Sequence, residues 1–281
     1  MFKTITLKPT KEKSILRRHP WVFSGAIKAI ENGISNGDIV EIKSNKGRFL
    51  GYGHYNEGSI AIRIFELNQL TIDNAYWEGK IKKAISQRHQ NLDINGKNNI
   101  YRLVHAEGDE MPGCIIDRYD NVIVMQFHSV GMWKLLEIFS KILAKKLPEI
   151  DAIYDKSENT LPEVLKQEFQ IQNSYLLRKI DASDVIASEY GNQFKINWVT
   201  GQKTGFFIDQ RENRKLLGEY SQNKVILNTF CYSGGFSIYA LNKGAKEVYS
   251  LDSSKKAMKL VEENVKLLPQ DLKQKHHSIT D

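Results

Sequence analysis

The sequence predicts a multidomain chain of mixed α/β and α+β class, in which a small β barrel and an α+β domain precede a nucleotide-binding α/β domain. Two observations carry this prediction. Apolar and polar residues alternate in glycine-punctuated segments of the first seventy positions, which is typical of short strands. Residues 224–252 contain a strand, a glycine-rich turn, a helix and a second strand, which is the order of a βαβ unit.

Length and composition set the limits of this assignment. A chain of 281 residues has room for two or three domains, and 41% apolar residues suffice for their cores. No segment is apolar enough to span a bilayer, and the N-terminus lacks the apolar stretch of a signal peptide, so we expect a cytoplasmic protein without membrane contact. Two distant cysteines fit a reducing compartment. The net charge of +7 permits RNA binding but does not require it.

Periodicity predicts the elements of the first two domains, which we place at residues 1–72 and 73–178. The expected elements are barrel strands at 38–42 and 59–65, a helix at 73–91, a hairpin at 113–117 and 122–127, a helix at 131–147 and a strand at 150–156.

The third domain, residues 179–281, begins with an expected hairpin arm at 188–199. Asp209 and Glu212 have the spacing of a capping box, which predicts Asp209 as the N-cap of a helix that runs to Tyr220. Ser253 is the expected cap of a later helix at 254–268. The last four residues are expected to end a third strand.

The turn Ser233-Gly234-Gly235 and Asp252, at the end of the second strand, indicate a nucleoside cofactor. Backbone amides at such a turn can bind a carboxylate or phosphate, and the acid can accept bonds from two ribose hydroxyls. Capping of the next helix is the alternative role of Asp252. The third glycine of the dinucleotide fingerprint is absent, which disfavours a nicotinamide oxidoreductase without excluding it.

The residues around this turn resemble motif I of class I S-adenosylmethionine methyltransferases that act on RNA, and residues 204–214 resemble the segment that covers the methionine end of the cofactor. The resemblance implies S-adenosyl-L-methionine as the cofactor. Together with the turn and the acid described above, the resemblance implies a set of cofactor-binding residues, in which Asp281 would contact the adenine amine. They are Gln210, Arg211, Asn228, Thr229, Phe230, Tyr232, Ser233, Gly234, Gly235, Asp252, Ser253 and Asp281.

The resemblance extends along the chain. Residues 17–25, 37–40 and 51–56 are similar to the N-terminal PUA domain of the large-subunit ribosomal RNA cytosine-C5 methyltransferase family, and residues 107–119 also match that family. It implies a PUA-like β barrel, a middle α+β domain and a C-terminal Rossmann-like methyltransferase domain, with ribosomal RNA as partner. The sequence does not decide whether the protein forms a homodimer.

The predicted third domain has fewer strands than this family's sheet, so we expect an incomplete catalytic domain. The resemblance implies that the nucleophile and an Asp-Pro-Pro signature lie downstream of Asp281, so no catalytic residue is assigned and this fragment is expected to be inactive. Cys231 and Cys114 are interpreted as packing residues. His276 and His277 are interpreted as a solvated helix end, and no metal site is expected.

The N-terminal domain offers a basic surface for RNA, with one ring that could stack on a base. Its residues are Lys11, Lys13, Arg17, Arg18 and Trp21. The alternative is a solvated basic face with Trp21 in the core. The family resemblance alone implies the favoured function, which is formation of 5-methylcytosine in large-subunit (23S) ribosomal RNA. Methylation of another base or atom, and a non-catalytic RNA-binding protein with a vestigial cofactor domain, stay open.

Overall fold

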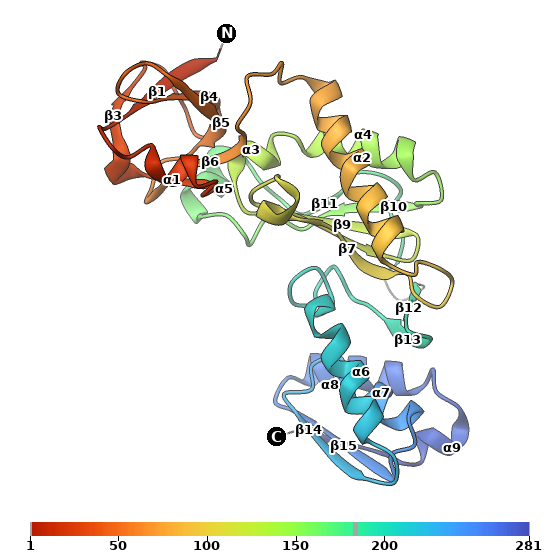
Figure 1. The fold of residues 1–281 in the computed structure, drawn as a ribbon. Helices are drawn as coiled ribbons and strands as arrows, with labels where there is room; N and C mark the ends of the chain where they lie inside the picture. Colours follow the sequence, from red (N-terminus) through yellow and green to blue (C-terminus); the bar gives the residue numbers. More distant parts are fainter. Residues whose placement is uncertain (1, 182–184, 281) are drawn as a thin grey trace. The chain divides into compact units, whose positions relative to one another are not determined.

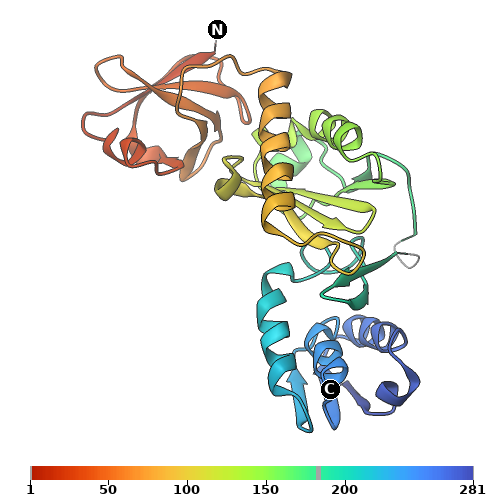
Figure 2. The ribbon, with the colours of Figure 1, turned by 45° about the vertical axis from the view of Figure 1, so that its right-hand side comes forward.

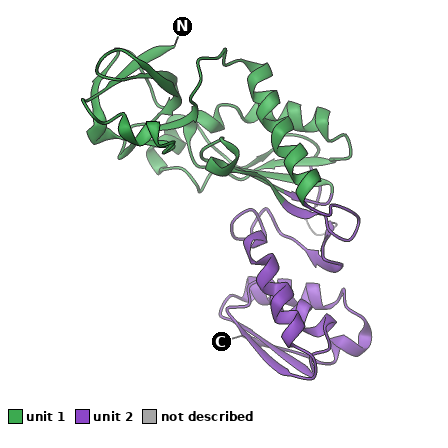
Figure 3. Cartoon of the chain, viewed as in Figure 1, with its two compact units in different colours: residues 1–91, 102–117, 121–178 green, residues 92–101, 118–120, 179–281 purple. Residues whose placement is uncertain are grey.

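The computed structural model describes residues 2–181 and 185–280, and the chain divides into two compact units (Figure 3). Unit 1 comprises residues 1–91, 102–117 and 121–178, and unit 2 comprises residues 92–101, 118–120 and 179–281. Within the described ranges, no helix combines the length and the apolar character that a membrane crossing requires.

The N-terminal part of unit 1 is a six-stranded sheet (Figure 1). Its elements are β1 (Lys3–Leu7), α1 (Lys13–Leu16), β2 (Trp21–Phe23), η1 (Ser24–Ala26), β3 (Ile27–Ile30), β4 (Ile39–Lys43), β5 (Phe49–Tyr55) and β6 (Ile60–Glu66). The strand order is β2-β6-β5-β4-β1-β3, and only the β1–β4 pairing is parallel among those described. Val40 and Ile42 alternate with half-buried residues along β4, so the period of two directs them into the core. The predicted β fold of this region is confirmed.

A second, five-stranded sheet follows, with the order β11-β10-β9-β8-β7. The elements of this region are α2 (Asn74–Asn91), β7 (Ile100–His105), η2 (Ala106–Asp109), β8 (Cys114–Tyr119), β9 (Val122–Phe127), α3 (Val130–Trp133), α4 (Leu136–Lys146), β10 (Ala152–Asp155), α5 (Glu163–Glu168) and β11 (Ser174–Tyr175). Helices α2 and α4 pack side by side, with the rings of Trp77 and Phe139 5.8 Å apart (Figure 2). The predicted middle α+β domain is thus confirmed in outline, and its sheet contains both parallel and antiparallel pairs.

The continuous helix predicted at residues 131–147 is wrong, because the chain forms α3 and α4 with a break between them. Leu135 has a ψ of 1°, outside helical geometry, and its amide bonds to the carbonyl of Met132, three residues back, at 3.0 Å. The indole of Trp133 donates to the buried carboxylate of Asp155 at 3.2 Å. This tertiary bond accompanies the break, and the apolar periodicity of the sequence gives no sign of it.

Unit 2 contains a hairpin and a parallel sheet with helices (Figure 1). Its elements after residue 185 are β12 (Ile186–Glu189), β13 (Asn192–Lys195), η4 (Ile208–Gln210), α6 (Arg211–Tyr220), β14 (Val225–Thr229), α7 (Gly235–Asn242), β15 (Glu247–Asp252), α8 (Lys255–Val265), α9 (Gln270–Lys273) and β16 (His276–Thr280). β14 pairs with β15, and β15 with β16, all in parallel. The predicted hairpin, βαβ unit and third strand are therefore confirmed.

Three local predictions in unit 2 are wrong. Gln210, not Asp209, precedes the first residue of α6, because a 3₁₀ turn occupies the preceding residues. Ser254, not Ser253, caps α8, and its hydroxyl accepts a bond from the amide of Ala257 at 3.3 Å. His276 and His277 lie in β16, not at a helix end, because they pair with β15. Local patterns thus located the starts of the two helices to within about one turn. The strand that contains His276 and His277 depends instead on pairing with β15.

Candidate cofactor site

The turn between β14 and α7 holds three residues with left-handed backbone geometry, at alternate positions. Phe230, Tyr232 and Gly234 have φ angles of 56°, 48° and 73°. This conformation costs about 1–2 kcal/mol for a residue with a Cβ. The amide of Cys231 bonds to the carbonyl of Leu251 at 3.1 Å and so ties the turn to β15. The surrounding fold therefore maintains a strained turn, a feature that concentrates at ligand sites.

Asp252 ends β15 beside this turn. Its Oδ2 accepts a hydrogen bond from the amide of Tyr232 at 3.0 Å, and its Oδ1 accepts one from the amide of Ser254 at 2.9 Å. The two amides fix the orientation of a half-buried carboxylate. Because a carboxylate has about four acceptor positions, each oxygen keeps capacity for one more donor. Two adjacent hydroxyl groups, as on a ribose, match this arrangement.

The turn and Asp252 lie on a cleft of about 790 Å³ within unit 2. The lining residues are Asn197, Thr200, Gly201, Gln202, Phe207, Phe230, Tyr232, Asp252, Ser254, Lys256, Ala257, Lys259, Leu260 and Glu263. The rings of Phe207 and Tyr232 meet edge to face, with centroids 5.2 Å apart. The hydroxyl of Tyr232 accepts from the amide of Gln202 at 2.9 Å and donates to the carbonyl of Gly205 at 3.1 Å. The loop before α6 is thereby attached to the turn.

These residues fit S-adenosylmethionine. The free acceptor positions on Asp252 suit the ribose, and the aromatic walls suit the adenine and the thioether carbon chain. The cleft is also large enough for a molecule of this size. Gly201 is needed for this shape, since a Cβ there would lie 2.7 Å from the Tyr232 hydroxyl and 2.2 Å from the carbonyl oxygen of Asn197.

The structure brings part of the predicted site together. Phe230, Tyr232 and Asp252 line the cleft, and Phe230 is 88% exposed. Three small residues that join the turn to the start of α7 are buried, which explains why they are small; these are Ser233, Gly234 and Gly235. The cofactor role of each residue stays a prediction.

Other predicted residues do not line the cleft. Arg211 is buried and pairs with Glu189. Gln210 bonds to the side chains of its neighbours Asp209 and Asn213. Asn228 donates to the hydroxyl of Ser237 at 2.9 Å. Thr229 and Ser253 are exposed outside the cleft, and Asp281 lies outside the described residues.

Sequence reasoning missed two walls of the cleft. One is the loop with Gly201, Gln202 and Phe207, and the other is the face of α8 that carries Lys256 and Lys259. The segment that resembles the methionine-covering region contains Phe207, so this segment reaches the cleft through a side chain other than the two assigned from the resemblance. The α8 residues carry no recognisable pattern, because a helix face becomes a cleft wall only through the packing of the helix.

The two cysteines are buried. Burial raises the pKa of the Cys231 thiol to about 11, and its sulfur lies 3.6 Å from the sulfur of Met258. Burial also raises the pKa of Cys114. Both thiols are therefore protonated near neutral pH and pack as apolar groups. In the described residues no three His, Cys, Asp or Glu side chains form a group that could hold a metal ion.

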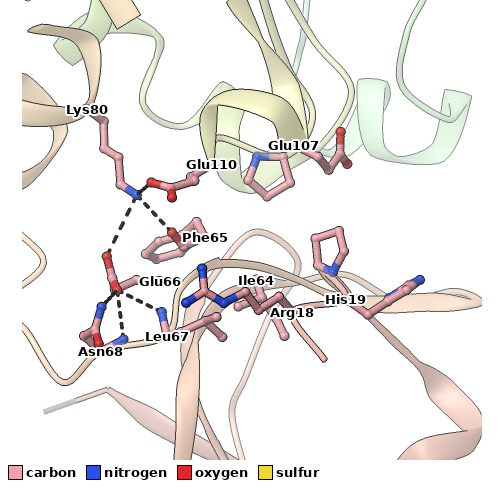
Figure 4. A pocket seen from close by; sticks show the side chains of 12 residues that line it. Arg18, His19, Ile64, Phe65, Glu66, Leu67, Asn68, Lys80, Glu107 and Glu110 are labelled. Atoms are coloured by element: carbon pink, nitrogen blue, oxygen red, sulfur yellow. Dashed lines mark hydrogen bonds and ion pairs between the residues drawn. The ribbon is translucent and has the colours of Figure 1, made fainter. Parts of the chain in front are cut away.

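The residues predicted to bind RNA lie in unit 1. Lys11, Lys13, Arg17 and Arg18 are exposed. Trp21 is half-buried, and its indole N–H donates to the carboxylate of Glu107 at 2.9 Å, so its position is intermediate between the two predicted roles. Arg18 has a φ of 62° and lines a separate cavity of about 280 Å³ in unit 1 (Figure 4).

Two family models match the chain. A PUA-like domain matches residues 5–67, and an S-adenosylmethionine-dependent methyltransferase matches residues 176–278. The cleft lies in the second segment, and S-adenosylmethionine is the cofactor of that family. A solved structure of a putative methyltransferase complexed with SAH has a TM-score of 0.83 at 19% identity, covering 100% of this chain and 70% of that one. This likeness shows a common fold.

Curated relatives match nearly the whole chain. The ribosomal RNA large subunit methyltransferase I of Pseudoalteromonas atlantica is 38% identical over 267 residues, which cover 94% of this chain and 66% of the relative. The enzyme of the same name from Tolumonas auensis is 34% identical, with 97% of this chain and 68% of the relative covered. The chain thus spans about two thirds of the length of the relatives it matches. It belongs to the ribosomal RNA large subunit methyltransferase I family.

Proposed function

We propose that this protein uses S-adenosylmethionine to methylate carbon 5 of a cytosine in large-subunit ribosomal RNA, in the cytoplasm. The names of its relatives support the RNA substrate. The observation that carries the cofactor assignment is Asp252, whose two oxygens are oriented by backbone amides and keep acceptor capacity toward the cleft. The proposed domain borders are residues 72 and 178.

The residues of the chain have separate parts in this reaction. Asp252 binds and orients the ribose, and the Phe207–Tyr232 ring pair forms an apolar wall. The bound cofactor supplies an electrophilic methyl group. Cytosine-C5 methylation also needs a thiolate that adds to carbon 6 of the base. Neither cysteine suits this role, because burial keeps both thiols protonated. No nucleophile is therefore assigned among the described residues.

Asp252→Asn tests the cofactor assignment. The exchange keeps the size of the side chain but removes its charge and one acceptor oxygen. We expect S-adenosylhomocysteine affinity to fall about 10- to 100-fold, since hydrogen bonds to a charged group contribute about 1.5–3 kcal/mol. Isothermal titration calorimetry measures this change. Asp271→Asn, at an exposed aspartate in the first turn of α9, is the matched control and should bind as the wild type does.

Equal affinity of wild type and a folded Asp252→Asn variant would sink the ribose assignment. The same titration with NADH tests the nicotinamide alternative. We expect the wild type not to bind NADH, and NADH binding would favour that alternative. Methyl transfer from labelled cofactor to ribosomal RNA, measured with the full reading frame, separates the enzyme from a non-catalytic RNA-binding protein. Transfer supports the enzyme, and its absence supports the non-catalytic protein.

A further inference from the structure

A buried charge network in unit 2 adjoins the candidate cofactor cleft, because one of its members bonds to a residue that lines the cleft. Its centre is Glu189, at the end of β12, which has no exposed surface. Arg214 of α6 binds both carboxylate oxygens, through Nε and Nη2, each at 2.8 Å. Arg211 donates through Nε at 3.2 Å, and Tyr239 of α7 donates its hydroxyl at 3.0 Å. The network thus joins the hairpin, α6 and α7.

Arg214 differs from the other members because it also reaches the wall of the cleft. Its Nη1 donates to the carbonyl of Phe207 at 2.8 Å, and its guanidinium lies 4.5 Å from the ring centroid of Phe206. On another side, its Cδ would lie 3.0 Å from a Cβ added to Gly235, the first residue of α7. One side chain therefore packs against the loop before α6 and against the start of α7, directly after the turn that follows β14.

The chemistry of this contact requires an arginine. The planar guanidinium presents donors in fixed directions, so the bidentate bond to Glu189 fixes where Nη1 points, and Nη1 in turn holds the Phe207 carbonyl. A lysine would keep the charge but lose this fixed geometry. Well-packed apolar residues often give a core as much stability as a buried ion network does. Stability alone therefore does not account for this arrangement, whereas orientation of Phe207 does.

We propose that Arg214, held by Glu189, is a positioning residue that sets the Phe207–Tyr232 wall of the cleft before the cofactor binds. The chain of contacts runs from the Glu189 carboxylate through the Arg214 guanidinium to the Phe207 carbonyl. It continues from the Phe207 ring to the ring of Tyr232, whose hydroxyl oxygen accepts a hydrogen bond from the amide of Gln202. This proposal rests on the assignment of the cleft to S-adenosylmethionine.

Arg214→Lys in this chain is the test, with Tyr239→Phe as the matched control. Both variants lose bonds to Glu189, but only Arg214 bonds to Phe207. We expect Arg214→Lys to weaken S-adenosylhomocysteine binding at least tenfold by calorimetry and to speed hydrogen exchange of the Gln202 amide at least tenfold. Tyr239→Phe should lower the thermal unfolding midpoint yet leave both quantities within twofold of the wild type.

A second variant covers the case in which Arg214→Lys does not fold. Glu189→Gln keeps the shape of the centre and removes the charge that orients Arg214, so it should shift both quantities in the same direction to a smaller extent. Equal changes in the control and the Arg214 variant, or no change in the folded Arg214 variant, would overturn the proposal. If the wild type itself does not bind S-adenosylhomocysteine, the cofactor assignment fails, and hydrogen exchange still decides the positioning role.

Discussion

The cavity that Arg18 lines in unit 1 and the cleft that Asp252 lines in unit 2 differ in how their charged side chains are hydrogen-bonded. In the cavity of unit 1, Lys80 bonds to Glu110 at 2.7 Å and lies 3.9 Å from Glu66 (Figure 4). In the same cavity, Glu107 accepts the indole N–H of Trp21. In the cleft of unit 2, by contrast, Asp252 is oriented by two backbone amides and keeps acceptor capacity.

This difference indicates which hollow is built for a ligand. Side chains that neutralise one another gain little from a bound molecule, because a ligand would first have to break their bonds. A carboxylate that is oriented by amides needs no such rearrangement. We therefore interpret the cleft as preorganised for a ligand, and the Lys80–Glu110 side of the unit 1 cavity as a paired, structural contact.

The largest expected effect comes from filling the cleft at Gly201. A Cβ there meets backbone and the Tyr232 hydroxyl well inside van der Waals distance. Gly201→Val should therefore displace the loop from the turn, cost about 1–3 kcal/mol in unfolding free energy and lower S-adenosylhomocysteine affinity more than tenfold. Urea unfolding and calorimetry measure the two quantities. Gly79→Ala is the control, because a Cβ in α2 meets nothing within 4 Å. If the Gly201→Val variant bound S-adenosylhomocysteine as tightly as the wild type does, the cleft of unit 2 would not be the preorganised ligand site.

A smaller effect is expected in the unit 1 cavity, from Lys80→Met. The hydrogen bond from Lys80 lowers the pKa of Glu110 below its usual value of 4.5. A lowered carboxyl pKa stabilises the fold above the usual pKa, and this stabilisation is lost as the pH falls through the lowered value. The variant should lose about 1 kcal/mol at pH 7 and show a weaker fall in stability on acidification. Urea titrations from pH 7 to pH 3 measure both, and cofactor affinity should not change.

The smallest effect on stability is expected from reversing the charges of Arg17 and Arg18, which are exposed. The unfolding midpoint and cofactor affinity should stay the same. Affinity for ribosomal RNA fragments should fall, and the slope of log affinity against log salt should decrease by about one for each phosphate that the protein no longer neutralises. Filter binding across a salt series measures this slope. If the variant binds RNA at low salt as tightly as the wild type does, these arginines do not contribute to RNA binding and form only a solvated basic face.

The sequence alone predicted the features that depend on local pattern. The βαβ unit, the acid at the end of its second strand and the β fold of the N-terminal region follow from periodicity and turn residues, and the structure contains them. These predictions succeeded because the hydrophobic period and the small residues of a turn are written in consecutive positions. Helix caps were less secure: Ser253 and Ser254 are equivalent candidates until the chain direction at the end of β15 is known.

Only the tertiary structure decided which side chains face the cleft. Phe207 and Arg211 come from one recognisable segment, but Phe207 lines the cleft whereas Arg211 turns toward Glu189. The partners in the Glu189–Arg214 network are 25 positions apart in the chain and lie on different elements. No local pattern encodes such a pair, because the cost of burying each charge is offset only by a partner that folding brings into contact.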